Sequence, residues 1–171
     1  MSAVLIVVGG LPATGKSSLC ALVARRTRMP WLRVDRIEDA IVRSTALEHP
    51  VGVVGYAVAY ALAAEQLRHG IDVIAECVNP LLVTREAWRQ IAVQEQARLL
   101  EVEVICSDAS EHHRRAVTRQ VDIDGHPLPT WEAITGREYQ DWDRDHLVID
   151  TARSSVDDGA AQIIHAAWPT G

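Results

Sequence analysis

The stretch "GLPATGKSS" at residues 10–18 decides the fold of this chain of 171 residues. It holds the spacing G-x-x-x-x-G-K-S, in which glycines let the backbone approach an anion closely and a lysine supplies positive charge. Lys16 is the only lysine in the sequence. The apolar run at residues 4–8 predicts a buried strand before the loop, and the apolar periodicity of residues 17–26 predicts a helix after it. Strand, loop and helix together predict a phosphate-binding loop.

Backbone N–H groups at the start of a helix form an anion site, so we expect this loop to bind the phosphates of ATP. Lys16 should reach the β- and γ-phosphates, and the hydroxyl of Ser17 should ligate Mg²⁺. The predicted nucleotide-binding residues of the loop are Gly10, Pro12, Ala13, Thr14, Gly15, Lys16, Ser17 and Ser18.

The composition is that of an ordinary globular domain, with 48% hydrophobic and 23% charged residues. The length predicts a single domain over residues 1–171. No basic segment precedes the first apolar run, and the longest uncharged stretch, residues 50–64, is too short to span a membrane. We therefore expect a cytoplasmic protein without membrane association. Its three cysteines show no paired spacing and are expected to be buried free thiols.

Apolar runs typical of strands alternate with helical patterns along the whole chain. The expected strands are residues 4–8, 30–35, 71–77, 99–106 and 146–150. The expected helices are residues 17–26, 36–47, 50–70, 81–97, 110–120, 131–142 and 155–168. This alternation predicts an α/β fold with three layers, in which helices cover both faces of a five-stranded parallel sheet. Ligands of such sheets bind at the carboxyl ends of the strands.

Two carboxylates and an amide follow expected strands. Asp35 ends the second strand, Glu76 lies near the end of the third, and Asn79 comes three residues later. Glu76 is a candidate magnesium residue, either as a direct ligand or through water. Asp35 either binds the acceptor or forms a capping box with Glu38 at the start of the next helix. Asn79 either belongs to the substrate pocket or makes the Asn-Pro turn.

Further substrate contacts are expected from the helices after the second strand. Tyr56 and Tyr60 lie one helical turn apart, either in the core or as an amphipathic wall of the pocket. Arg36 follows Asp35 and closes a cluster with Arg25, Arg26, Arg28 and Arg33. The first three of these arginines suit the end of a helix, where cations are favourable. The alternative is a basic track for nucleic acid, which the net charge of −6 disfavours.

Arginines also precede a segment that contains one glycine and two prolines, residues 121–130. Phosphoryl-transfer enzymes close arginines over the transferring group and exclude water. We expect a lid over about residues 114–130, with Arg115 and Arg119 on one helical face as its catalytic pair. The alternative is an ordinary solvated helix face.

The single lysine also excludes the Asn-Lys-x-Asp motif by which GTP-binding switches recognise guanine. The motifs "GLPATGKSS", "RVD" and "IAECVNP" resemble those of small ATP-dependent kinases of the P-loop NTPase superfamily, close to zeta toxins and AAA-type ATPases. The likeness extends to chloramphenicol phosphotransferase, shikimate and gluconate kinases and the kinase half of polynucleotide kinase. It runs through nearly the whole chain, including "EHHRRAVTR" and "LVIDT".

This resemblance implies a nucleoside-monophosphate-kinase-like fold with a short lid. It also implies that Asp35 activates the acceptor hydroxyl, that Arg115 and Arg119 are lid arginines, and that Thr151 lies near adenine. The relatives commonly carry aspartate where this chain has the longer Glu76.

The sequence therefore predicts a magnesium- and ATP-dependent kinase that phosphorylates a hydroxyl of a small molecule. The net charge disfavours nucleic acid as a partner. Two alternatives stay open, a polynucleotide 5′-hydroxyl kinase and a non-catalytic ATP-binding regulatory domain. Neither the acceptor nor the oligomeric state follows from the sequence.

Overall fold

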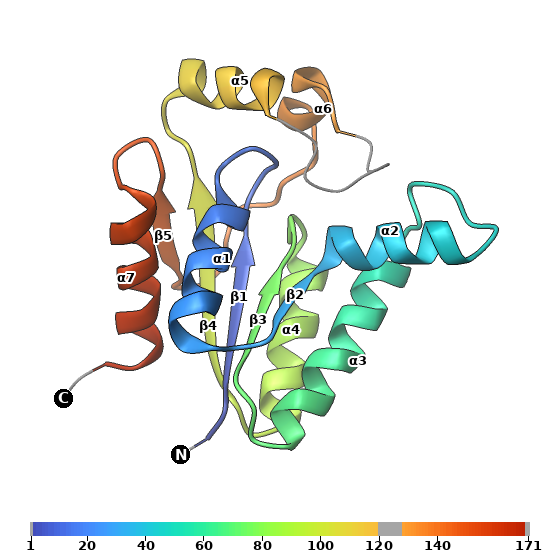
Figure 1. Cartoon of the computed structure of the whole chain (residues 1–171), viewed down its shortest axis with the longest axis vertical. Helices are drawn as coiled ribbons and strands as arrows, with labels where there is room; N and C mark the ends of the chain where they lie inside the picture. The colour runs from blue at the N-terminus through green and yellow to red at the C-terminus, as the bar shows by residue number, and fades with distance from the viewer. Residues whose placement is uncertain (1, 120–127, 170–171) are drawn as a thin grey trace.

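A computed structural model describes residues 2–119 and 128–169 (Figure 1). Its centre is a parallel sheet of five strands in the order β2-β3-β1-β4-β5. The strands are β1 (Val4–Gly9), β2 (Trp31–Arg33), β3 (Val73–Glu76), β4 (Arg98–Ile105) and β5 (Leu147–Asp150). The predicted α/β fold with its parallel sheet is confirmed.

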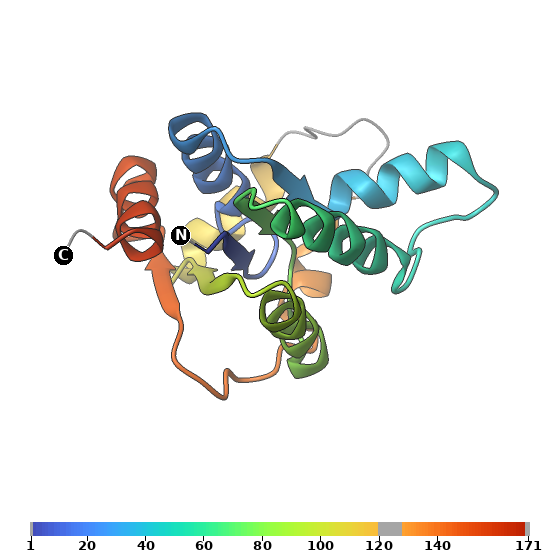
Figure 2. The same ribbon diagram turned by 90° about the horizontal axis from the view of Figure 1, so that it is seen from below.

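Helices cover both faces of this sheet because its central strands are buried on both sides. On one face lie α1 (Lys16–Thr27) and α7 (Val156–Ala167), and on the other lie α3 (Val54–Arg68) and α4 (Leu82–Gln94). Seen from below in Figure 2, α1 and α4 lie on opposite sides of β1. Alternate β1 residues enter the two cores: Ile6 packs with the α1 and α7 side, Leu5 with the α3 and α4 side.

The remaining helices lie toward the carboxyl edge of the sheet. Helix α2 (Val34–Ser44) leaves β2 and packs against α3, while α5 (Ala109–Thr118) and α6 (Trp131–Thr135) lie above the end of β1 (Figure 1). The site that the sequence predicts is therefore bordered by β1, β2, β3 and these three helices.

Three of the predicted boundaries that bear on the site are wrong. Strand β2 is shorter than expected, ends at Arg33, and passes directly into α2 at Val34. Helix α5 ends at Thr118, and Arg119 has an extended backbone with φ −61° and ψ 139°. Arg119 therefore does not share a helical face with Arg115. Helix α6 ends at Thr135, before Gly136, rather than near residue 142.

The chain after α6 is not helical as predicted, because its backbone groups form hydrogen bonds with distant residues. The backbone N–H of Gln140 donates to the carbonyl of Pro80 at 2.8 Å. The guanidinium of Arg85, which is fully buried, donates to the carbonyls of Gln140 and Asp141. Trp142 covers this guanidinium, with 4.1 Å between Cζ and the ring centre. These bonds hold residues 140–142 against α4 in an irregular conformation.

All three cysteines are free and buried, as predicted. Within the described residues, no helix combines the length and the apolar character that crossing a bilayer requires.

Candidate active site

The predicted phosphate-binding loop joins β1 to α1 and has the backbone of an anion cradle. Gly10 and Gly15 have φ angles of 136° and 100°, which side chains other than glycine rarely adopt. A Cβ on Gly10 would lie 2.2 Å from the carbonyl oxygen of Val104, so the loop passes too close to β4 for any larger residue. Ala13 also has a positive φ, 65°, a conformation that costs about 1 kcal/mol for a residue with a Cβ. Such strain is concentrated at functional sites.

Lys16 opens α1 and folds back over the loop. Its Nζ donates to the carbonyl of Leu11 at 2.8 Å, and only 8% of the residue is exposed. Burial lowers the pKa of Lys16, while the negative charges of Glu76 and Asp35 raise it. Both carboxylates are therefore within electrostatic reach of the ammonium group, although they come from different elements of the chain.

Ser17 and Glu76, the two candidate magnesium residues, are in direct contact. The hydroxyl of Ser17 donates to Oε1 of Glu76 at 2.5 Å, and Glu76 is only 4% exposed. Burial raises the pKa of Glu76, whereas Lys16, Ser17 and Arg33 lower it. A hydroxyl and a carboxylate at the end of a parallel strand are the hard oxygen donors that Mg²⁺ prefers. The donor set therefore fits the ion.

Asp35 lies in the first turn of α2. The residue before the helix is Arg33, and no side chain caps this helix end, so the predicted capping box does not form. A carboxylate in the first turn is still favoured by the helix dipole. Arg36, the next residue, is exposed on α2.

The sequence does not predict that Trp31 and Arg33 contact the candidate magnesium residues. Strand β2 alternates, so Trp31 and Arg33 share the face toward α1, and the sheet register sets Arg33 beside Glu76. The indole Nε1 of Trp31 donates to Oε2 of Glu76 at 3.0 Å. Nη2 of Arg33 donates to the Ser17 hydroxyl at 3.3 Å, and its Nε lies 3.5 Å from Oε2 of Glu76. The alternation of "WLR" places Trp31 and Arg33 on the same face of the sheet. Together with a neighbouring strand that ends in Glu76, this alternation is the signal that could have identified them.

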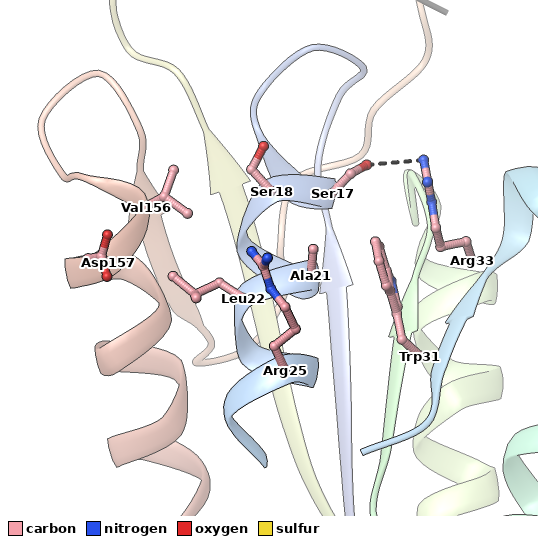
Figure 3. A pocket seen from close by; sticks show the side chains of 9 residues that line it. All are labelled: Ser17, Ser18, Ala21, Leu22, Arg25, Trp31, Arg33, Val156 and Asp157. Atoms are coloured by element: carbon pink, nitrogen blue, oxygen red, sulfur yellow. Dashed lines mark hydrogen bonds between the residues drawn. The ribbon is translucent and has the colours of Figure 1, made fainter. Parts of the chain in front are cut away.

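These two residues also line an open groove of about 510 Å³ along the outer side of α1 (Figure 3). Ser17 and Ser18 form its upper end and Arg25 its lower part, with Leu22 and Val156 opposite β2. Figure 3 shows the Arg33 side chain directed at Ser17, at the mouth of the phosphate loop.

The tyrosines expected in the pocket wall turn their hydroxyls toward backbone groups. The hydroxyl of Tyr56 accepts from the backbone N–H of Asn79 at 2.9 Å, and that of Tyr60 donates to the carbonyl of Thr84 at 3.3 Å. Tyr60 packs edge-on against Trp88, with ring centres 4.5 Å apart. Tyr56 therefore supports the loop after β3, whereas Tyr60 packs against α4.

Asn79 has two features that a simple turn does not explain together. Its φ is 52°, a left-handed conformation that asparagine tolerates better than most residues, but Asn79 and Pro80 lie in irregular backbone rather than in the predicted turn. Its side chain is fully buried, yet neither Oδ1 nor Nδ2 has a hydrogen-bond partner among the described residues. Its Nδ2 lies 3.7 Å from where a Cβ of Gly9 would be, next to the phosphate loop. A buried amide without partners is costly and calls for a ligand or a water.

Helix α5 contacts the phosphate loop through two residues. Nη1 of Arg115 donates to the Thr151 hydroxyl at 2.8 Å, and that hydroxyl in turn donates to the carbonyl of Thr14 at 2.7 Å. His112, which the sequence analysis did not single out, places Nε2 2.8 Å from the carbonyl of Pro12. Thr151 and Arg115 thus lie beside the loop, but in this structure Arg115 is engaged by Thr151 and Glu111.

Residues 120–127 of the predicted lid lie outside the described residues. The structure brings together Lys16, Ser17, Asp35 and Glu76, and sets Thr151 and Arg115 on the neighbouring side of the loop.

No protein-family model matches the chain, and no curated protein matches its sequence. Solved structures do match. A candidate kinase from Chloroflexus aurantiacus is 17% identical with a TM-score of 0.78, over 96% of this chain and 98% of that one. APS kinase CysC of Mycobacterium tuberculosis, solved with AMPPNP and APS, is 19% identical with a TM-score of 0.69, over 95% and 96%. A gluconokinase from Sinorhizobium meliloti 1021 is 19% identical with a TM-score of 0.65, over 97% and 94%.

The likeness covers nearly the full length of both chains in each case, and it shows that this chain shares the fold of these three structures. The chain carries the phosphate-binding loop of that fold at the expected junction of β1 and α1.

Proposed function

We propose that this protein is an ATP-dependent phosphotransferase that moves the γ-phosphoryl group to a hydroxyl of a small molecule. One observation carries the proposal: Lys16, Ser17, Glu76 and Asp35 converge at the carboxyl edge of the sheet, beside a strained phosphate loop. Cation, hydroxyl and two carboxylates are the groups that phosphoryl transfer to an alcohol requires.

The loop binds the nucleotide in this proposal. Backbone N–H groups of residues 13–18 contact the phosphates, and Lys16 exchanges its bond to the Leu11 carbonyl for phosphate oxygens. Ser17 and Glu76 hold Mg²⁺, with Glu76 acting directly or through water. When bound, Mg²⁺ supplies charge neutralisation at the phosphates.

Asp35 serves the acceptor. Its carboxylate orients the acceptor hydroxyl and takes the proton as the oxygen bonds to the γ-phosphorus and the bond to ADP breaks. Arg115 and Arg119 contribute positive charge on the lid side. Arg115 reaches the transferring group by exchanging its bonds with Thr151 for phosphate oxygens, and Thr151 lies toward the adenine.

The acceptor pocket lies between the phosphate loop, α2 and the loop after β3. Asp35 and Arg36 border it from α2, and Asn79 borders it from the β3 side. Tyr56 supports the loop after β3, and Tyr60 supports the first turn of α4. The names of the similar structures favour small acceptors, since they include a gluconokinase, a sugar kinase and an APS kinase.

The polynucleotide alternative has one observation in its favour, the groove that joins Trp31, Arg25 and Arg33. An aromatic ring beside arginines can stack a base and bind phosphate. However, Arg33 is engaged with Glu76 and Arg26 with Asp157, so the basic cluster does not form a continuous track. We therefore favour the small acceptor.

A screen for acceptor-stimulated release of ADP tests the function. Purified protein with Mg²⁺ and ATP would be offered sugars, nucleosides and hydroxylated antibiotics, with Asp35→Asn and Lys16→Ala as controls. Stimulation that Asp35→Asn abolishes supports the kinase. ATP binding without turnover under any acceptor favours the regulatory domain instead.

A further inference from the structure

Three side chains around Glu76 form one connected network with it. Ser17 donates to Oε1, Trp31 donates to Oε2, and the Arg33 guanidinium contacts both Oε2 of Glu76 and Oγ of Ser17. Arg33 also lies over the ring of Trp31, with 5.2 Å between Cζ and the ring centre. Both oxygens of the carboxylate are thus engaged.

This network places a cation of the protein itself against the two proposed magnesium residues. The side chains of Glu76 and Arg33 are only 5% and 13% exposed, so bulk water screens their attraction weakly. In its present state the Ser17 hydroxyl donates its proton to Glu76 and accepts from Arg33. Arg33 uses one of the two lone pairs of the Ser17 hydroxyl and places its positive charge against Glu76. It therefore disfavours a divalent ion at Ser17 and Glu76 until its side chain moves away.

Trp31 and Arg33 of β2 differ in charge and in their freedom to move away from Glu76. Trp31 holds Glu76 through an uncharged N–H group, which fixes the orientation of the carboxylate without neutralising it. Arg33 is charged and lies at the edge of the open groove along α1, into which its flexible side chain can turn.

We propose that Arg33 is a built-in competitor of Mg²⁺, holding Ser17 and Glu76 until a nucleotide brings the metal. This rests on the proposed function, because it assumes that Ser17 and Glu76 are the magnesium residues. Phosphate oxygens entering the loop attract the guanidinium away from Glu76 and, with the same step, present the metal. Trp31 stays bonded to Glu76 and is a positioning residue. Divalent ions alone bind weakly as a result, and metal and nucleotide bind cooperatively.

The test is a titration of the nucleotide-free protein with Mn²⁺, in which the electron paramagnetic resonance signal of the free ion measures how much Mn²⁺ is bound. Arg33→Gln should bind Mn²⁺ roughly tenfold or more tightly than the unaltered protein, because a positive charge beside the site is removed. Arg25→Gln is the matched control: it removes a charge from the same groove, but no contact to Glu76, and should leave Mn²⁺ binding unchanged. Arg33→Lys keeps the charge and should resemble the unaltered protein.

Unchanged or weaker Mn²⁺ binding by folded Arg33→Gln overturns the proposal. If that variant does not fold, Arg33→Met replaces it, since methionine preserves an unbranched stem against Trp31. Binding of ATP by the unaltered protein is measured separately. If ATP does not bind, the proposed function is wrong. The Mn²⁺ titration tests the competition between Arg33 and the metal separately, because it needs neither nucleotide nor turnover.

Discussion

The hydroxyl of Ser17 lies 2.5 Å from Oε1 of Glu76, although the two residues are 59 positions apart in the chain. The contact exists because β1 and β3 are neighbours, with Val8 in register with Glu76, and the phosphate loop returns the chain to the same edge. This contact joins the start of α1 to the end of β3, and the proposed catalytic residues Lys16 and Asp35 lie near it.

Lys16→Ala should remove most nucleotide binding while the protein stays folded. The side chain's ammonium group is buried, and burial lowers its pKa, so its removal relieves a desolvation cost as it loses one hydrogen bond to Leu11. Isothermal titration with ATP and a thermal melt check both parts. Near-normal turnover by the folded variant would refute the role of the loop.

Asp35→Asn should keep ATP affinity within severalfold and lose turnover by on the order of 10² or more, as expected for a positioned base. The structure shows no capping bond from this side chain, so the melting temperature should change little. Steady-state kinetics and a melt distinguish the outcomes. Poor ATP binding would instead assign the aspartate to the metal, and an effect on melting alone would make it structural.

The sequence predicts the parts of the site that local patterns encode. The phosphate loop, the five parallel strands and the strand-end position of Glu76 follow from spacing and apolar periodicity. Asp35 was placed at a strand end but lies inside α2, because β2 has only three residues and helix geometry begins at Val34. The pattern "DRIE" resembles a cap, but a capping box needs its first residue before the helix.

Features that depend on distant contacts were not predictable in this way. Arg85 donates to the carbonyls of residues 140 and 141, which the sequence pattern predicts to lie in a helix. No local pattern indicates that these carbonyls bond to a distant arginine instead. The sequence groups Arg33 with the charges next to it along the chain, whereas the structure pairs it with Glu76 on the neighbouring strand. Pairing of this kind depends on the order of the strands, which periodicity alone does not give.

Asn79→Gly should weaken acceptor binding at little cost in stability. Glycine accepts the φ of 52° and removes two buried polar atoms that have no partner among the described residues. Gln96→Gly is the matched control, because Gln96 also has a positive φ, 51°, but lies at the end of α4 away from the loop. We expect kcat/KM for the acceptor to fall about three- to tenfold in Asn79→Gly only, the value of one hydrogen bond.

The two variants should melt within a few degrees of each other. A much larger loss of stability in Asn79→Gly, with unchanged acceptor kinetics, would show that the buried amide has a structural partner such as an ordered water.

The buried thiol of Cys77 should make stability fall in alkali. Burial raises the pKa of Cys77 from 9.0 to about 12, so the unfolded chain loses this proton at lower pH than the folded one. The stability it contributes is complete below pH 9 and declines as pH rises toward 12. Urea midpoints at pH 8, 10 and 11 should fall less steeply in Cys77→Ala than in the unaltered protein. Parallel slopes would mean that this thiol ionises as it does in the unfolded chain.

Oligonucleotides should bind weakly and should not be phosphorylated at 5′-hydroxyl ends. The chain has a net charge of −6, and contact with Asp157 already engages Arg26 of the basic cluster. A polynucleotide acceptor would need several phosphate contacts, and its affinity would then fall by about 0.9 log unit per contact for each tenfold rise in salt. Binding of labelled DNA and RNA at several salt concentrations, with transfer of radioactive phosphate from ATP, measures both properties. Efficient labelling of a 5′ end, lost in Arg25→Gln, would instead assign the groove of Trp31 and Arg25 to a nucleic-acid strand.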